Sequence, residues 1–136
     1  MKDLLVPLER RPIRSDKANP PVASYSQGYQ VGPYVFVSGQ MPVDPATGQL
    51  AAGGTPEHTR QSLKNVFGVL EAAGCTYEHV AQATVYMKKL DEIDEMDRVW
   101  QEFFPDPDNY CSRAVIGINE LVVGACVEIQ CIAIKD

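Results

Sequence analysis

The chain has 136 residues, and its 18 acidic and 12 basic side chains give a formal charge of −6 at pH 7. This length predicts one domain, which can bury about two thirds of its surface and so needs no disulfide or metal to stabilise its core. An acidic chain lacks the basic face that binding to nucleic acids or anionic membranes requires, and no apolar run approaches the ~20 residues of a membrane span. The N-terminus does not resemble a secretory signal, so we expect a cytoplasmic protein.

Residues 1–22 are rich in proline and charge, which predicts a loosely ordered N-terminal arm with room for a short strand. The domain itself is expected to cover residues 23–136. It opens with two β-rich runs, 26–31 and 34–38, separated by a Gly-Pro dipeptide that is typical of a hairpin turn. A second turn is predicted at 44–48.

A helix is predicted next. Thr55 is a suitable N-cap with Pro56 behind it, apolar residues then recur at helical spacing, and Gly74 supplies the stop. The remaining predicted elements are a strand at 80–87, a helix at 91–104, and strands at 113–118 and 125–134. This order predicts an α+β fold in which both helices pack on one face of a single mixed sheet.

Alternation along the last three strands separates two faces of the predicted sheet. One face is small and apolar and is expected to pack under the helices, whereas the other mixes apolar and polar side chains. The pattern assigns these residues to the mixed face: Tyr86, Arg113, Val115, Glu128, Ile132 and Ile134. Two helices, each about 10 Å wide, cannot cover both sides of a sheet, so the mixed face is expected to meet another copy of the protein.

Arg113 and Glu128 are the charged residues of this mixed face. Long charged side chains are rarely buried unless they are paired, so one interpretation is a structural ion pair, within the chain or across an interface. The other is a polar pocket at a subunit boundary. There Arg113 would bind a ligand carboxylate with its two-pronged guanidinium, and Glu128 would move a proton or orient water.

The four cysteines form no C-x-x-C pair and lie far in sequence from both histidines, so we expect reduced thiols and no metal site. His58 falls in the first turn of the first predicted helix and His79 in a polar connection, and both are predicted to be solvated. Gly53-Gly54 lacks the phosphate-binding lysine of a P-loop, which favours a plain helix entry there.

Several blocks of the sequence resemble one family. Residues 37–48, VSGQMPVDPATG, resemble the S-G-Q-x-P-x-x-P-x-T-G segment of the Rid family, the reactive-intermediate imine deaminases that are also called the YjgF family. Similar family blocks are RQSLKNV at 60–66, LEAAG at 70–74 and the ending VEIQCIA at 127–133. The resemblance runs from about Tyr25 to Ile134, with the blocks in the family's order.

The resemblance implies a chorismate-mutase-like fold assembled as a homotrimer, with sites in clefts between adjacent subunits. It also implies hydrolysis of small carboxylate-bearing imine or enamine intermediates, of the 2-aminoacrylate type, to 2-oxo acids and ammonia without a cofactor or metal. Arg113 matches the family arginine that grips the substrate carboxylate, and Glu128 matches the glutamate near the attacking water. Tyr25 matches the pocket tyrosine, and Ser38-Gly39 matches the hydroxyl and backbone contact.

Four positions, in three places of the chain, depart from the family pattern. Val115 stands where many members have cysteine, which preserves a backbone contact to the substrate but removes any thiol role. Asp97 stands where some members have asparagine, and Cys111-Ser112 where Pro-Ala is common.

Three alternatives to a general imine deaminase stay open from the sequence. One is a non-catalytic protein that binds 2-oxo acids or related metabolites. Another is an interaction or translation-regulating protein that acts through its trimer surface. A third is a pathway-specific deaminase, for example of the aminomuconate type.

Overall fold

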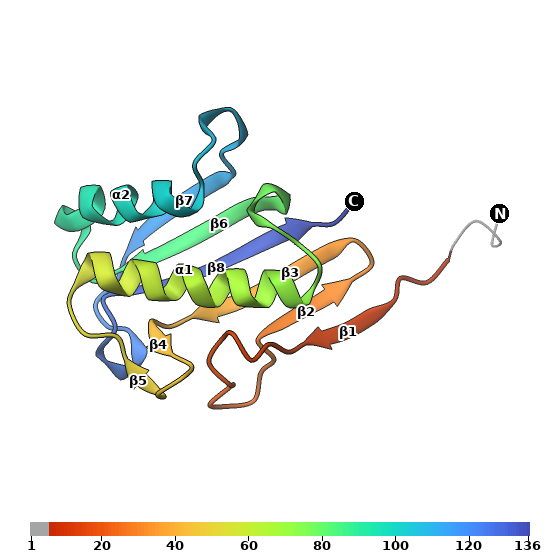
Figure 1. Cartoon of the computed structure of the whole chain (residues 1–136), viewed down its shortest axis with the longest axis horizontal. Helices are drawn as coiled ribbons and strands as arrows, with labels where there is room; N and C mark the ends of the chain where they lie inside the picture. Colours follow the sequence, from red (N-terminus) through yellow and green to blue (C-terminus); the bar gives the residue numbers. More distant parts are fainter. Residues whose placement is uncertain (1–5) are drawn as a thin grey trace.

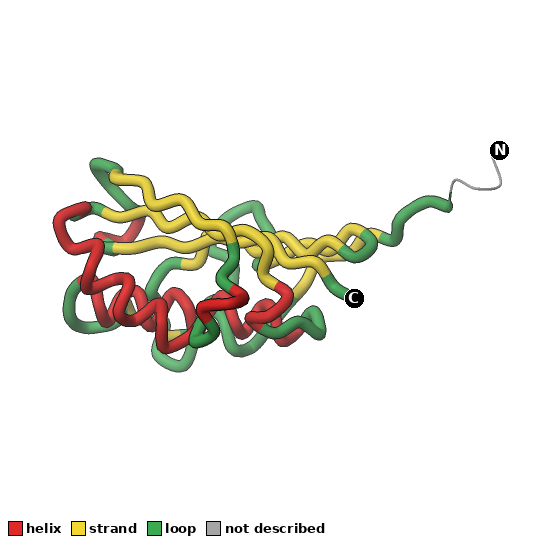
Figure 2. The backbone as a smooth tube through the Cα atoms, turned by 90° about the horizontal axis from the view of Figure 1, so that it is seen from above, coloured by secondary structure: helices red, strands yellow, loops and turns green. Residues whose placement is uncertain are grey.

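A computed structural model describes residues 6–136, and in it a six-stranded mixed sheet carries both helices on one side. The long helical segments lie below the strands in the edge view of Figure 2. The strand order is β1 (Arg10–Ile13), β2 (Gly28–Val31), β3 (Tyr34–Gln40), β8 (Val127–Ile134), β6 (Val80–Met87) and β7 (Ser112–Gly117), as labelled in Figure 1. Neighbouring strands are antiparallel except β6 and β7, which run parallel on either side of a helical crossover.

The predicted α+β order with both helices on one face is therefore confirmed. The helices are α1 (Thr55–Ala72) and α2 (Ile93–Phe103). Short 3₁₀ turns are η2 (Tyr77–His79), η3 (Leu90–Glu92), η4 (Pro107–Asn109) and η5 (Val122–Gly124). The predicted turn at 44–48 lies inside a small additional hairpin of β4 (Val43–Asp44) and β5 (Gln49–Leu50).

The start of α1 differs from the prediction by one residue. Gly54 is the N-cap, and its backbone N–H donates to the Glu57 carboxylate at 2.8 Å. Thr55 is the first helical residue, and its hydroxyl donates instead to the Glu92 carboxylate at 2.7 Å. Glu57 satisfies the cap backbone from the third helical position, which frees the Thr55 side chain to tie α1 to η3.

The core lies between the two helices and the sheet. It is formed by the apolar stripe of α1 (Leu63, Val66, Val69 and Leu70), Met96 and Trp100 of α2, and alternate residues of the strands. Trp100 stacks on Phe104 with ring centroids 4.6 Å apart. The four cysteines are free thiols, and Cys75 and Cys131 lie in this core. Within residues 6–136 the helices are too short or too polar to cross a membrane.

The register of β6, β7 and β8 decides which side chains share a face. Ala83 pairs with Arg113 on β7 and with Cys131 on β8, and both Ala83 and Cys131 are buried under the helices. Arg113 and Val115 therefore lie on the helix side of the sheet, and the prediction that placed them on the mixed face was wrong. The open side of β7 carries Ile116 instead, so apolar character did not distinguish the two sides of this edge strand.

The open face of the sheet is rich in apolar side chains. Glu128 pairs with Tyr86, and Tyr86 with Ile116, which places all three on this face. The exposed large apolar side chains that share it are Tyr29, Tyr34, Phe36, Ile116 and Ile134. A face of this kind is typical of a surface that meets another protein.

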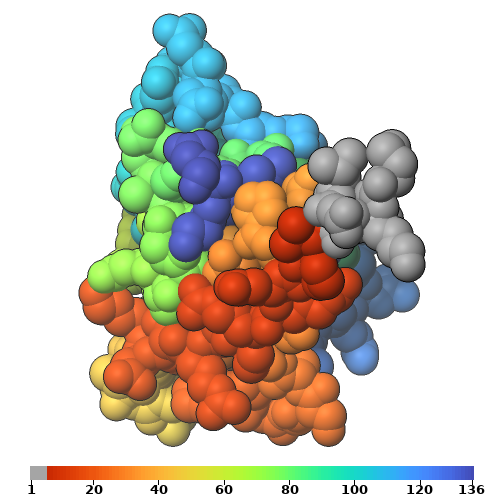
Figure 3. Space-filling view, turned by 90° about the vertical axis from the view of Figure 1, so that its right-hand side faces the viewer, coloured from red at the N-terminus to blue at the C-terminus, as the bar shows by residue number. Residues whose placement is uncertain are grey.

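Part of the segment 1–22 joins the sheet. Arg10–Ile13 forms β1 and pairs with β2, and Ile13 and Ala18 are buried. In the space-filling view of Figure 3 this segment, in red, packs against the orange hairpin. Residues 1–5 of the predicted arm lie outside the described residues.

His58 is buried, with 2% of its surface exposed, so the prediction that it is solvated was wrong. Its Nδ1 accepts the Cys126 N–H at 3.0 Å, and its Nε2 lies 2.9 Å from the Ala51 carbonyl oxygen. Because a backbone N–H can only donate, the ring proton is on Nε2 and is donated to Ala51. The ring thus joins α1 to the loop before it, which follows β5, and to the residue that directly precedes β8. The position of His58 within a helix does not by itself reveal this role. His79 is partly exposed and accepts the Thr76 N–H.

Candidate active site

A cavity of about 470 Å³ on the open side of the sheet brings together four of the predicted site residues: Tyr25, Ser38, Gly39 and Glu128. Its other lining residues are Val22, Ala23, Met41, Val122, Val123 and Gln130. The sequence blocks that resemble the family are far apart in the chain, and the pairing of β3 with β8 makes their residues adjacent.

A β-bulge shapes the floor of this cavity. Val37 pairs with Cys131 and Gln40 with Ile129, so Ser38 and Gly39 together oppose the single residue Gln130. Bulges bend a strand and redirect its side chains, and they are common beside active sites. Here the bulge presents the backbone of Ser38-Gly39 to the cavity.

Gly39 leaves room for the Glu128 side chain in its observed position. A Cβ atom at residue 39 would lie 2.6 Å from Oε2 of Glu128, which is closer than real Cβ contacts occur. The carboxylate therefore rests directly against the backbone of the bulge. The Ser38 hydroxyl donates to the Ser26 carbonyl at 2.6 Å, which ties the bulge to the segment that carries Tyr25.

Glu128 is half-buried, and burial raises the pKa of its carboxyl above the ordinary value. A carboxylate with a raised pKa is a better base at neutral pH than an exposed one. Glu128 is therefore equipped to accept a proton from water or to return one to a leaving group.

Arg113 lies outside this cavity, on the other side of the sheet. Its guanidinium carbon is 4.9 Å from the centroid of the Trp100 ring, and Nη1 donates to Asp97 Oδ1 at 2.8 Å. The three residues line a second cavity of about 410 Å³ together with Gln101, Tyr110 and Cys111. A single chain thus presents Arg113 and Glu128 on opposite faces and does not bring them together.

Val115 lines neither cavity. It lies two residues after Arg113 on the helix side and packs, partly buried, against the core. Its side chain has a packing role in the single chain.

Sequence reasoning missed the partner of Arg113. Asp97 and Trp100 are three residues apart and so lie on the same face of α2. Burial would raise the pKa of Asp97, but hydrogen bonds from Arg113 and Gln101 outweigh it and lower that pKa below the ordinary value. The helical spacing could have placed these two side chains together, but only the parallel pairing of β6 and β7 shows that Arg113 meets them.

The rim of the Glu128 cavity contains a strained residue that the sequence did not reveal. Val123 has φ 55° and ψ 18°, a left-handed conformation that is rare for a β-branched side chain. Val122 and Val123 are both largely exposed, although they are apolar. Such strain persists where the surroundings impose it, and it is often found at functional sites.

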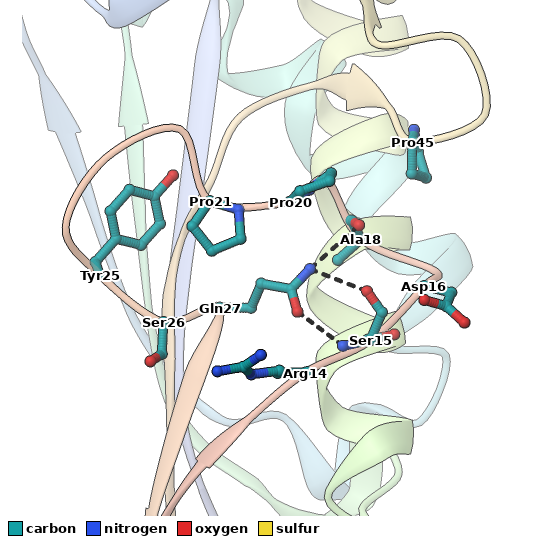
Figure 4. Close-up of a pocket in the computed structure, with 10 residues that line it drawn as sticks. All are labelled: Arg14, Ser15, Asp16, Ala18, Pro20, Pro21, Tyr25, Ser26, Gln27 and Pro45. Atoms are coloured by element: carbon teal, nitrogen blue, oxygen red, sulfur yellow. Dashed lines mark hydrogen bonds between the residues drawn. The ribbon is translucent and has the colours of Figure 1, made fainter.

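A larger cavity, of about 680 Å³, lies behind the loop that carries Tyr25 (Figure 4). Its buried amide, Gln27, makes four hydrogen bonds to the backbone of Ser15, Ala18 and Asn19. The Gln27 amide is fully satisfied by these bonds and ties the segment after Tyr25 to residues 15–19; Arg14 and Asp16 also line this cavity. In residues 6–136 no cluster of three or more His, Cys, Asp or Glu side chains is placed to hold a metal ion.

Comparison with known proteins identifies the family. The model of the family described as Endoribonuclease L-PSP matches residues 16–135. The human protein named 2-iminobutanoate/2-iminopropanoate deaminase is 34% identical over 128 residues, which cover 94% of this chain and 92% of that protein. A RutC family protein of Pyrococcus abyssi is 34% identical over 124 residues, which cover 91% of this chain and 96% of its own.

Solved structures agree with these sequence matches. A crystal structure of a putative endoribonuclease from Thermotoga maritima has a TM-score of 0.88 at 34% identity, and the match covers 93% of this chain and 98% of that one. The structure of Escherichia coli TdcF with bound serine has a TM-score of 0.87 at 30% identity, covering 93% and 99%. The chain therefore belongs to the Endoribonuclease L-PSP family, which is the Rid, or YjgF, family that its sequence blocks resemble.

Proposed function

We propose that the protein is a cofactor-independent deaminase that hydrolyses small 2-imino acids, and their enamine tautomers, to 2-oxo acids and ammonia. The observation that carries this proposal is the half-buried Glu128 carboxyl, whose pKa is raised by burial and which rests against the Ser38-Gly39 bulge inside a cavity. Relatives named 2-iminobutanoate/2-iminopropanoate deaminase, such as the human protein, support the same chemistry.

The reaction requires little of the protein. A protonated imine carbon is already electrophilic, so the enzyme holds the substrate, places a water molecule and moves one proton. As water attacks and the C–O bond forms, Glu128 accepts a proton from it. Glu128 then returns that proton to the nitrogen. As the C–N bond breaks and ammonia leaves, the new hydroxyl gives its proton back to Glu128 and becomes the carbonyl, and the ammonia takes that proton away as ammonium.

The site requires two copies of the chain. We place Arg113 of one copy beside Glu128 of the next in a homotrimer, as the family resemblance implies. Three features support this arrangement: Arg113 lies on the edge strand β7, Glu128 lies on the opposite face, and the open face is rich in exposed apolar side chains. Arg113 then binds the substrate carboxylate with the guanidinium edge that Asp97 leaves free.

The direct test is a coupled assay of Arg113→Ala. A pyridoxal-phosphate dehydratase generates the imine from serine or threonine, and release of the 2-oxo acid is followed with and without the protein. We expect the wild type to accelerate release and Arg113→Ala to lose at least about a hundredfold in kcat/KM, since a charged hydrogen-bonded pair is lost. Full activity in Arg113→Ala, or no acceleration by the wild type, would overturn the proposal.

The family description also includes ribonuclease activity, which we do not propose for this chain. A protein that cleaves RNA needs basic side chains along the phosphate backbone, whereas this chain has a formal charge of −6.

A further inference from the structure

The guanidinium of Arg113 is held on two sides before any ligand arrives. Its carbon lies over the ring of Trp100, which is 5% exposed, and its Nη1 donates to Asp97. Asp97 is itself fixed, because its other oxygen, Oδ2, accepts from the Gln101 amide at 3.0 Å. Three side chains of α2 thus hold Arg113 in place: Trp100 and Asp97 by direct contact, and Gln101 through Asp97.

These contacts leave one edge of the Arg113 guanidinium for a ligand. A guanidinium has five N–H groups in one plane, and Asp97 occupies one of them at Nη1. The Trp100 ring under the guanidinium and the bond to Asp97 together restrict its movement, so the remaining edge of Nε and Nη2 is left to bind a carboxylate through two parallel hydrogen bonds. Only a quarter of the Arg113 side chain is exposed, which limits other orientations.

Asp97 also changes the charge that a ligand meets. The Arg113 and Asp97 charges cancel, because the Asp97 carboxyl is ionised at neutral pH. Glu128, the charged residue that lines the other cavity of the proposed site, is acidic. A substrate with one carboxylate can use the geometry of the free guanidinium edge. A second carboxylate on the substrate meets Asp97 and Glu128, and the described residues add no further cation to either cavity lining.

We propose that Asp97 is a positioning and specificity-determining residue, which aligns Arg113 for one carboxylate and makes the site select against dicarboxylic imino acids. This inference rests on the proposed function, since it assigns Arg113 to the substrate carboxylate. Asparagine at this position would keep the oxygen that accepts from Nη1 and remove the charge, and its NH2 group can donate to Gln101 once the Gln101 amide turns to present its oxygen. The two roles of Asp97 can therefore be separated by substitution.

The test compares Asp97→Asn with Asp97→Ala. In Asp97→Asn we expect KM for 2-iminobutanoate to fall about three- to tenfold with kcat nearly unchanged, because a like charge near the ligand is removed. KM for a dicarboxylic imine, 2-iminoglutarate, should fall by a further factor of about three or more. In Asp97→Ala, kcat/KM should drop at least about tenfold below that of Asp97→Asn, because the guanidinium loses its alignment.

Binding gives a second readout that does not depend on turnover. Trp100 is the only tryptophan of the chain and lies under Arg113, so its fluorescence reports a ligand on the guanidinium. In titrations with 2-oxobutanoate and 2-oxoglutarate, the wild type should bind the monocarboxylate with the lower Kd. In Asp97→Asn the difference between the two Kd values should be smaller. Asp91→Asn, which removes the same charge from the exposed η3 turn, is the matched control and should change neither affinity.

The outcomes distinguish this inference from the proposed function. If Arg113→Ala abolishes turnover but Asp97→Asn leaves KM and both affinities within twofold of the wild type, the role of Asp97 is refuted and the deaminase proposal stands. If Arg113→Ala retains full turnover, both proposals fail. An Asp97→Ala variant that matches Asp97→Asn refutes the positioning role alone.

Discussion

The environment of Glu128 determines what this residue can do. Among residues 6–136, burial is the cause that shifts its pKa, and it shifts that pKa upward. The backbone of the Gly39 bulge lies against its carboxylate, where a side chain would collide with it. The protein therefore maintains a carboxyl that prefers its protonated form more than an exposed glutamate does, at some cost in stability when that carboxyl is ionised.

Glu128→Gln should abolish turnover but retain ligand binding. We expect kcat to fall about 10²- to 10⁴-fold, because glutamine cannot accept the proton, while Kd for 2-oxobutanoate changes little. In the wild type, kcat should fall on acidification through the raised pKa of Glu128, that is, above the usual range near 4.3. Stopped-flow measurements of kcat over a range of pH would show this fall. Glu120→Gln, on an exposed loop, is the control and should keep both the kcat of the wild type and its fall on acidification.

The same substitution should stabilise the fold at neutral pH. Because folding raises the pKa of the Glu128 carboxyl, the folded state favours its protonated form. That stabilising contribution is complete below the pKa of the unfolded state and is lost as pH rises through the pKa of the folded state. At pH 7 the ionised Glu128 therefore opposes folding, so Glu128→Gln should raise Tm slightly, and the gain should vanish near pH 4. A Tm that falls at pH 7 would show that the carboxylate makes a stabilising contact instead.

Among the elements, β7 shows where sequence reasoning succeeds and where it fails. Its existence and its bounds were predicted to within one residue, because β-rich runs between turns are a local property. Its two faces were predicted the wrong way round, because the more apolar face was expected to pack under the helices. At the sheet edge Ile116 is exposed on the open face, while Arg113 extends its charged end over Trp100 on the helix side. Only the pairing with β6, a non-local contact, settles the orientation.

The same distinction holds for the site. Tyr25, Ser38, Gly39 and Glu128 were found together because the family blocks identify them and the β3–β8 pairing gathers them. Asp97 was noted only as a departure from the family pattern. Its contact with Arg113 depends on the distance between α2 and β7, which no sequence pattern specifies.

His58 links three elements, and its removal should weaken the junction between α1, β5 and β8. In His58→Ala the Ala51 carbonyl and the Cys126 N–H lose their partner, and a cavity replaces the ring. We expect the free energy of unfolding to fall by about 2–4 kcal/mol, measured by urea denaturation at one fixed protein concentration. His79→Ala alters the other histidine, which is partly exposed, and should cost less than about 1 kcal/mol. Equal losses in the two variants would contradict the linking role of His58.

At the scale of the whole molecule, the two faces of the sheet have separate tasks. The helix side builds the core and aligns Arg113, and the open side bears the Glu128 cavity among exposed apolar residues such as Phe36 and Ile134. A sheet one residue-layer thick keeps these two groups apart within one chain. The proposed homotrimer resolves this separation, because the edge strand of one copy can reach the open face of the next.

Complementation between inactive subunits tests this arrangement. Arg113→Ala and Glu128→Gln are each expected to be inactive alone. When the two are unfolded, mixed in equal amounts and refolded together, about a quarter of the sites in a closed ring should pair the intact Arg113 of one variant with the intact Glu128 of the other. The mixture should therefore recover about a quarter of wild-type kcat per site with an unchanged KM.

The control for complementation replaces Glu128→Gln by the double variant that carries both substitutions. No intact Arg113 is then present, so this mixture should stay inactive. Light scattering on each sample establishes that the subunits assemble, and native mass spectrometry establishes that they mix. A site shared between two copies must be restored wherever the intact Arg113 of one variant meets the intact Glu128 of the other. If mixed oligomers form but no activity returns, Arg113 and Glu128 therefore do not share a site across two copies.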